Sequence, residues 1–292
     1  DTSAGGGSVT SVALTMPTEF SVAGSPVTTS GTLAVSKANQ NANLVFAGPS
    51  SGAAAAPTFR ALVVADVLDI MLTGSAGVLF DHFLNIPPTS AQGNAGLGLL
   101  QNASGSSAAV ATVATTDASS IGIIDLNTGV ATNGRAGVFS FASGIRFGGG
   151  ILDLTWRFQV VTLPDGTNDY DLTIGFLDAV NSSHTDGAYL FLSSASANFR
   201  YFTRNNTTTT NTDSGLAAVA GTWYTLRIVV NAAASSVTFT IDGGSSQAVG
   251  TNIPTGAGRE VGIGAGITKT AGTTARHAYV DYARFAWSGV SA

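Results

Sequence analysis

The chain has 292 residues, of which 44% are hydrophobic and only 10% are charged, so it is long enough to bury a full core. The formal net charge is −5, which excludes the clustered basic surface of a nucleic-acid-binding protein. Cysteine is absent, so disulfides and thiolate metal sites add nothing to the fold, and an extracellular protein of this kind needs a large β core, oligomerisation or both.

The chain opens with short β-like pieces and little apolar mass. Residues 1–8 have neither the basic nor the apolar region of a signal peptide and fit a flexible lead-in or the cut end of a longer protein. Strand patterns follow at 9–14, 20–23 and 32–35, with glycine-rich and proline-rich turns between them. Isolated two-stranded pieces are marginal in water, so this segment has to bury its faces against a partner, most economically other copies of itself.

A short helix is predicted over residues 60–72, RALVVADVLDIML, with Asp66 and Asp69 on one face and aliphatic side chains elsewhere. Such a helix is normally buried, so we expect a neck that packs on the next domain or lines the axis of a trimer. The stretch is too short to cross a membrane, and no membrane insertion is expected. Residues 1–72 therefore form the first predicted module, and 73–120 are a connector with the first strands of the following domain.

The remaining residues, 121–292, are dominated by period-2 alternation. In 151–162 the apolar residues alternate with polar ones, as in a half-buried antiparallel strand, and the pattern returns three times further on. We assign both Trp156 and Trp223 to the core. Strands at regular spacing, few helix signals and glycine-rich turns predict an all-β fold in which this segment is an antiparallel β-sandwich.

Two resemblances to known families sharpen these expectations. The phrases at 20–32 (FSVAGSPVTTSGT), 45–62 (VFAGPSSGAAAAPTFRAL) and 64–66 (VAD) closely resemble a module that recurs in bacteriophage tail fibres and related virion fibre proteins. Phrases such as NGRAGVF (133–139) and AGTWYTLRIVVNA (220–232) are similar to concanavalin-like jelly rolls, found at the ends of phage fibres and in laminin-G-type modules.

The first resemblance implies a homotrimeric fibre protein at the surface of a virion, as a head or tail fibre. Its expected partners are other copies of itself, other virion structural proteins and a glycan of the host cell surface.

The chain lacks the residue patterns of the common hydrolases. Only two glutamates occur, Glu19 and Glu260, and neither has an acidic partner at the E-x-D-x-x-E spacing of glycosidases that share the sandwich. The histidines His82, His184 and His277 lie far apart, and neither H-E-x-x-H nor G-x-S-x-G is present. We expect a non-enzymatic protein without a cofactor, although an aspartate pair or a Ser-His-Asp arrangement stays open.

One loop concentrates oxygen ligands of the kind that calcium prefers: Asp165, Asn168, Asp169 and Asp171. This is the candidate calcium site, and Asp178 and Asp186 flank a second polar loop. The spacing does not match an EF-hand, and ordinary turn chemistry explains the same residues.

The candidate saccharide site lies in residues 198–210. Saccharide sites combine a stacking aromatic ring with planar amide and guanidinium donors, because sugars have an apolar face and a fringe of hydroxyls. The predicted set is Arg200, Tyr201, Arg204, Asn205 and Asn206. The alternative is that Phe199 and Tyr201 point inward while the arginines are solvated.

The predicted function is therefore a non-enzymatic phage or phage-like fibre protein that attaches to the host by glycan binding through its C-terminal jelly roll. Several weak sites in one trimer would add through effective concentration. Two alternatives stay open: a purely structural virion or filament component without sugar binding, and a polysaccharide depolymerase.

Overall fold

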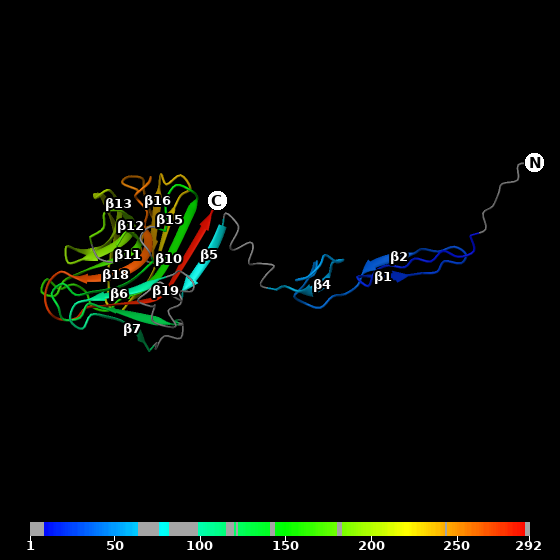
Figure 1. Ribbon diagram of the computed structural model, residues 1–292, viewed down its shortest axis with the longest axis horizontal. Helices are drawn as coiled ribbons and strands as arrows, with labels where there is room; N and C mark the ends of the chain where they lie inside the picture. The colour runs from blue at the N-terminus through cyan, green and yellow to red at the C-terminus, as the bar shows by residue number, and fades with distance from the viewer. Residues whose placement is uncertain are drawn as a thin grey trace, which may run out of the picture. The chain divides into compact units, whose positions relative to one another are not determined.

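The computed structural model describes residues 9–63, 76–81, 99–114, 120, 122–140, 144–179, 183–242 and 244–289. The chain divides into an N-terminal unit, 1–72, and a C-terminal unit, 73–292 (Figure 1). All regular elements within the described ranges are β-strands, which confirms the all-β fold class. Those ranges hold no helix with the length and apolar character that a membrane crossing requires.

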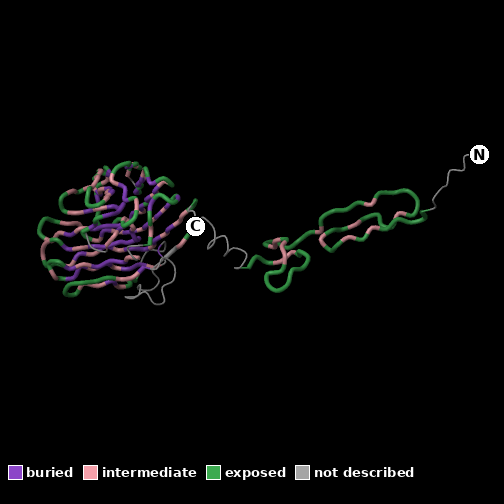
Figure 2. The backbone as a smooth tube through the Cα atoms, turned by 45° about the horizontal axis from the view of Figure 1, so that its top comes forward, coloured by how far each residue is buried: buried purple, intermediate pink, exposed green. Residues whose placement is uncertain are grey.

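The N-terminal unit contains two hairpins. Strand β1 (Phe20–Ala23) pairs antiparallel with β2 (Ala34–Lys37), and β3 (Leu44–Ala47) pairs with β4 (Thr58–Ala61). None of residues 9–63 is buried, and in Figure 2 the buried stretches of the tube are confined to the C-terminal unit. A unit of this size without a buried core has little hydrophobic stabilisation of its own to offset its ordering entropy.

The helix predicted over 60–72 is wrong at its start. Arg60 and Ala61 lie in β4, where Arg60 Nε donates a hydrogen bond of 2.6 Å to the carbonyl of Gly48. This contact across the hairpin and the pairing of Ala61 with Leu44 stabilise extended backbone at the two positions where the sequence pattern predicted the start of a helix. Residues 64–72 of the predicted helix, Asp66 and Asp69 included, lie outside the described residues.

The first sheet of the sandwich has eight strands, in the order β17-β16-β15-β10-β19-β8-β7, and β5 pairs with the C-terminal half of β19 beside β8. The strands are β5 (Ala76–Asp81), β7 (Ala109–Val113), β8 (Ile123–Asn127), β10 (Ile151–Val160), β15 (Trp223–Val230), β16 (Val237–Ile241), β17 (Gln247–Val249) and β19 (His277–Ser288).

The second sheet has seven strands, in the order β14-β13-β12-β11-β18-β9-β6, all paired antiparallel. They are β6 (Leu100–Ser104), β9 (Arg135–Phe139), β11 (Tyr170–Leu177), β12 (Gly187–Ser193), β13 (Ser196–Asn205), β14 (Thr208–Ala217) and β18 (Gly262–Lys269). Figure 1 shows this arrangement in the C-terminal unit, with β6 and β7 from the 73–120 segment adding to opposite sheets. The antiparallel β-sandwich prediction is confirmed.

The core lies between the two sheets, where the apolar faces of their alternating strands meet. Trp156 of β10 is fully buried, as predicted. Trp223 is not: it is half-buried on the outer face of the first sheet, where the Arg157 guanidinium lies 4.6 Å from its ring centroid. The reason is strand parity, because the inward residues of β15 begin with Tyr224.

Candidate functional site

The predicted saccharide residues lie on β13 and its hairpin to β14. Arg200, Tyr201 and Arg204 are strand residues, and Asn205 pairs with Thr208 across the turn. Asn206 and Thr207 form a two-residue turn with positive φ of 48° and 68°. This is the turn whose twist matches a tight hairpin, and asparagine tolerates it well.

Tyr201 is misassigned as a surface stacking residue. Its side chain is fully buried and its ring stacks on Phe239 of the opposite sheet, with centroids 4.9 Å apart. Burial raises the pKa of Tyr201 to about 12. The inward alternative is correct for both Phe199 and Tyr201, because odd-numbered residues of β13 face the core.

Phe202 occupies the outward position instead. It pairs with Tyr189 of β12, and the two rings stack with centroids 5.5 Å apart. Phe191, two residues further along β12, lies 4.9 Å from the Phe202 centroid. Phe191 and Phe202 are half-buried, whereas Tyr189, on the same face beside Phe202, is 2% exposed. Aromatic rings therefore line the outer face of β12 and β13.

The two arginines flank these rings in the neighbouring rows of the sheet. Arg200 pairs with Phe191 on one side and Asp213 on the other, while Arg204 pairs with Gly187. Arg200 Nε donates to Asn211 Oδ1 at 2.8 Å and its Nη1 lies 3.2 Å from Asp213 Oδ2, with 28% of the side chain exposed. We call Phe191, Arg200, Phe202, Arg204 and Asn211 the aromatic face.

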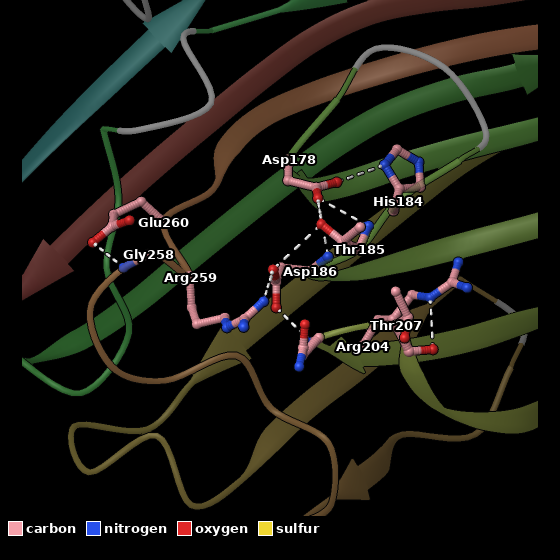
Figure 3. Close-up of polar contacts among 10 residues, drawn as sticks. Asp178, His184, Thr185, Asp186, Arg204, Thr207, Gly258, Arg259 and Glu260 are labelled. Atoms are coloured by element: carbon pink, nitrogen blue, oxygen red, sulfur yellow. Dashed lines mark hydrogen bonds and ion pairs between the residues drawn. The ribbon is translucent and has the colours of Figure 1, made fainter.

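A polar cluster lies where β11, β12 and β13 meet their loops, next to Arg204 (Figure 3). Asp178 follows β11, and its carboxylate accepts hydrogen bonds from the backbone N–H groups of Thr185 and Asp186 at 2.9 and 3.1 Å. It also accepts the Thr185 hydroxyl, and His184 Nδ1 lies 3.2 Å from its Oδ1. Burial alone would raise the pKa of Asp178, but the hydrogen bonds from His184, Thr185 and Asp186 lower it to about 2.

Asp186 connects this loop to two others. Its Oδ1 accepts the backbone N–H of Asn206 at 2.9 Å, and its Oδ2 lies 3.0 Å from Arg259 Nη1, ahead of β18. The side chain is almost fully buried, so this carboxylate holds three chain segments at one end of the second sheet. The cluster rigidifies the hairpin that carries Arg204 and Asn206.

The Asp178 interactions predict a specific acid sensitivity. Because its folded pKa lies below the usual value, its contribution to stability is present above about pH 4 and is lost as pH falls towards 2. We expect Asp178→Asn to cost on the order of 1 to 2 kcal/mol at neutral pH. The difference in melting temperature between wild type and variant should shrink between pH 5 and pH 2, and a constant difference would contradict this.

The candidate calcium loop is organised by the chain itself. Asp165 Oδ1 accepts the backbone N–H groups of Thr167 and Asn168 at 2.9 and 2.7 Å, and its Oδ2 pairs with Arg276. These hydrogen bonds lower the pKa of Asp165 to about 2. Asp169 Oδ1 accepts the N–H of Gly166.

Asn168 Oδ1 accepts the N–H of Thr274, and Asp171 lies separately in β11. Within the described ranges no three His, Cys, Asp or Glu side chains converge as a metal site would require. The ordinary turn interpretation accounts for Asp165, Asn168 and Asp169, whereas Asp171 is a strand residue.

Sequence reasoning missed the outward aromatic residues Phe191 and Phe202 and the partner residues Asn211, Asp213 and Arg259. The signal for Phe202 was present, since Arg200, Phe202 and Arg204 share one parity in β13. Arg259 had no such signal, because it lies 73 residues from Asp186 in sequence.

The C-terminal unit has the concanavalin-like jelly-roll fold, an antiparallel β-sandwich of two sheets. The chain belongs to the SO2946-like family, because the model of the SO2946-like C-terminal domain matches residues 119–281. A comparison with curated proteins found no match.

Among solved structures, the protein of unknown function SO2946 from Shewanella oneidensis MR-1 is similar, with a TM-score of 0.59 and 15% identity over 80% of this chain and 98% of its own. Peanut lectin has a TM-score of 0.44 and 10% identity over 73% of this chain and 97% of its own. The endo-1,3-beta-glucanase from Streptomyces sioyaensis has a TM-score of 0.47 and 13% identity, over 73% and 97%. At these identities the likeness concerns the fold alone.

Proposed function

We propose that this chain is a non-enzymatic fibre protein of a phage or phage-like particle, which self-associates as a homotrimer through its N-terminal unit and binds host glycans through its sandwich. The observation that carries the proposal is that none of residues 9–63 is buried. Such a unit becomes stable only when another surface covers it. The assignment to a phage particle and the choice of a trimer over other oligomers both rest on the resemblance of residues 20–32 and 45–62 to the fibre module.

The apolar surface of the N-terminal unit supports self-association. A groove of about 360 Å³ runs between its hairpins, with Phe20, Phe46 and Phe59 in its lining, and Phe46 is 56% exposed. Among residues 9–63, seven large apolar side chains are exposed: Val9, Val12, Phe20, Val35, Phe46, Leu62 and Val63. Patches of this kind mark interaction surfaces in soluble proteins. Other virion structural proteins are the further partners expected of a fibre.

The aromatic face supports glycan binding. Phe191 and Phe202 offer ring surface to the apolar side of a sugar, and Arg200, Arg204 and Asn211 flank them with donors for hydroxyl groups. A single solvent-exposed site of this kind binds a glycan weakly. Three such sites in one trimer raise the overall affinity, because binding at the first site increases the effective concentration of the glycan at the others.

The aspartate geometry argues against a depolymerase at the polar cluster. Asp178 and Asp186 form a close acidic pair, since both contact the Thr185 hydroxyl. Glycoside hydrolysis needs one carboxylic acid that stays protonated near neutral pH. The pKa of Asp178 is lowered to about 2, and Asp186 is paired with Arg259.

A purely structural role is the second candidate, and one observation favours it. Arg200 already donates to Asn211 and Asp213, and Arg204 Nε lies 3.3 Å from the carbonyl of Thr207, so both arginines have partners within the sheet. In that case the aromatic face would only stabilise the edge of the sandwich.

A glycan array separates the two roles. The intact wild-type chain should bind a subset of bacterial surface glycans, and Phe202→Ala and Arg200→Ala should each weaken that binding roughly tenfold or more, because a stacking contact or a charge-assisted hydrogen bond is lost. Arg227→Ala is the matched control, since it removes an exposed arginine paired with Asp153 on the opposite sheet. Absence of binding to any glycan or host cell would leave the structural role.

A further inference from the structure

A second pocket lies away from the aromatic face, at one end of the sandwich, where β10 begins and β19 ends. It has a volume of about 170 Å³, and its walls include Ile145, Leu152, Phe285 and Trp287. Leu152 and Trp287 are partners in the β10–β19 pairing, and the rings of Phe285 and Trp287 are 5.5 Å apart. One wall of the pocket is therefore a pair of aromatic rings held by the first sheet.

The opposite wall is the segment 144–150 between β9 and β10. Ile145 and Val261 exchange two backbone hydrogen bonds of 3.0 and 2.9 Å, which anchor this segment beside the start of β18. The buried ring of Phe147 packs against Phe176 and fixes its other end to the core. The β10–β19 pairing therefore fixes one wall of the pocket, and the bridge between Ile145 and Val261 fixes the other.

The polar side of this pocket is positive. Its one charged lining residue is Arg146, which is exposed, and two of its lining glycines, Gly144 and Gly149, are exposed and have no side chain to cover their backbone. Among the residues that the structure describes, no carboxylate pairs with Arg146. Most other arginines of the sandwich are paired: Arg157, Arg200, Arg227, Arg259, Arg276 and Arg284 each lie within ion-pair distance of an aspartate.

Because no carboxylate of the described residues pairs with Arg146, its guanidinium is available to an external anion. Pockets that take drug-sized ligands are about 300 to 1,000 Å³, so this smaller one accommodates a single ring. Aromatic walls complement the apolar side of a pyranose, and exposed backbone groups complement its hydroxyls.

We propose that this pocket binds one carboxylated sugar residue, a hexuronic or sialic acid, with its ring on Trp287 and its carboxylate on Arg146. The choice of a sugar over other carboxylates rests on the proposed glycan-binding function, whereas the requirement for an anion rests on the pocket alone. The host glycan would then be acidic, and the pocket would select it independently of the aromatic face.

The test is a titration of the intact chain with glucuronic acid, with N-acetylneuraminic acid and with glucose as the neutral match, followed by saturation-transfer NMR. At least one acidic sugar should bind roughly tenfold more tightly than glucose, and Arg146→Met should abolish that preference because the charge-assisted hydrogen bonds are lost. Trp287→Ala should weaken binding of the acidic sugar, and Arg200→Ala on the aromatic face should leave it unchanged.

Equal affinity for glucose and both acidic sugars, or an Arg146→Met chain that keeps the preference, would overturn the proposal. Cyclohexanecarboxylate that binds as tightly as the sugar acids would overturn its saccharide part. The two proposals can fail separately. If the aromatic-face variants bind the glycan array as the wild type does, while binding of the acidic sugar still depends on Arg146, the aromatic face is not a glycan site and the pocket is.

Discussion

Tyr201→Ala should destabilise the sandwich by about 3 to 5 kcal/mol, whereas Tyr201→Phe should leave its stability unchanged or slightly raised. The alanine variant loses the ring that stacks on Phe239 across the core and leaves a cavity behind. In the described part of the chain the Tyr201 hydroxyl is buried without a hydrogen-bond partner, so its removal costs nothing and relieves a desolvation penalty.

Urea denaturation of the three proteins measures both effects. Tyr201→Phe should also bind glycans as the wild type does, because the residue does not reach the surface. A loss of more than about 1 kcal/mol in Tyr201→Phe would mean that the hydroxyl has a partner, and a loss of glycan binding would return Tyr201 to the site.

Arg157→Met should have a comparable effect for an electrostatic reason. Arg157 is the counter-ion of Asp281, whose side chain is 2% exposed, and it also donates to Ser120 Oγ at 2.7 Å. Removal of one partner from a buried ion pair costs about 3 to 5 kcal/mol, because the remaining charge stays desolvated. Asp281 lies at the point where the β10–β19 register shifts, so it has little freedom to move towards water.

Arg227→Met is the control for this variant. It breaks a pair with Asp153 in which the arginine side chain is 57% exposed, and such pairs contribute at most about 1 kcal/mol. Replacement of Asp281 by asparagine in the Arg157→Met background should recover part of the loss. Equal losses in Arg157→Met and Arg227→Met, measured by urea denaturation, would contradict the account.

The sandwich was predictable because its strands are buried on one face. The alternation of Leu152, Leu154, Trp156 and Phe158 determines which side of β10 faces the core, and the structure follows it. Trp223 was misassigned because it was placed in the core for lying in a strongly alternating strand, although its parity is opposite to that of the inward Tyr224. Stacking against Arg157 satisfies it on the outer face instead.

The candidate site was only partly predictable. The segment from Phe199 to Arg204 carries aromatic residues at both parities, so the local pattern does not decide which ring faces out. That choice depends on the opposite sheet, where Phe239 lies against Tyr201, and on β12, where Tyr189 stacks beside Phe202. The hydrogen bonds of Asp186 to Asn206 and Arg259 depend on loops that meet only after the sheet has formed.

For the N-terminal unit, self-association was predicted because its sequence has too little apolar mass to form a core of its own. Short hairpins with small side chains were expected to need a partner, and the structure places Phe20 and Phe46 at the surface rather than in a core. Because the isolated chain gives this unit no buried residue between 9 and 63, we expect its order to depend on assembly with other copies.

The most direct test of the central claim, that the N-terminal unit assembles the chain into a fibre-like homotrimer, is the mass of the intact protein in solution. Light scattering coupled to gel filtration should give three times the chain mass of 29.2 kDa across the micromolar range. A mass near 29.2 kDa at every concentration would contradict the trimer and the fibre assignment built on it.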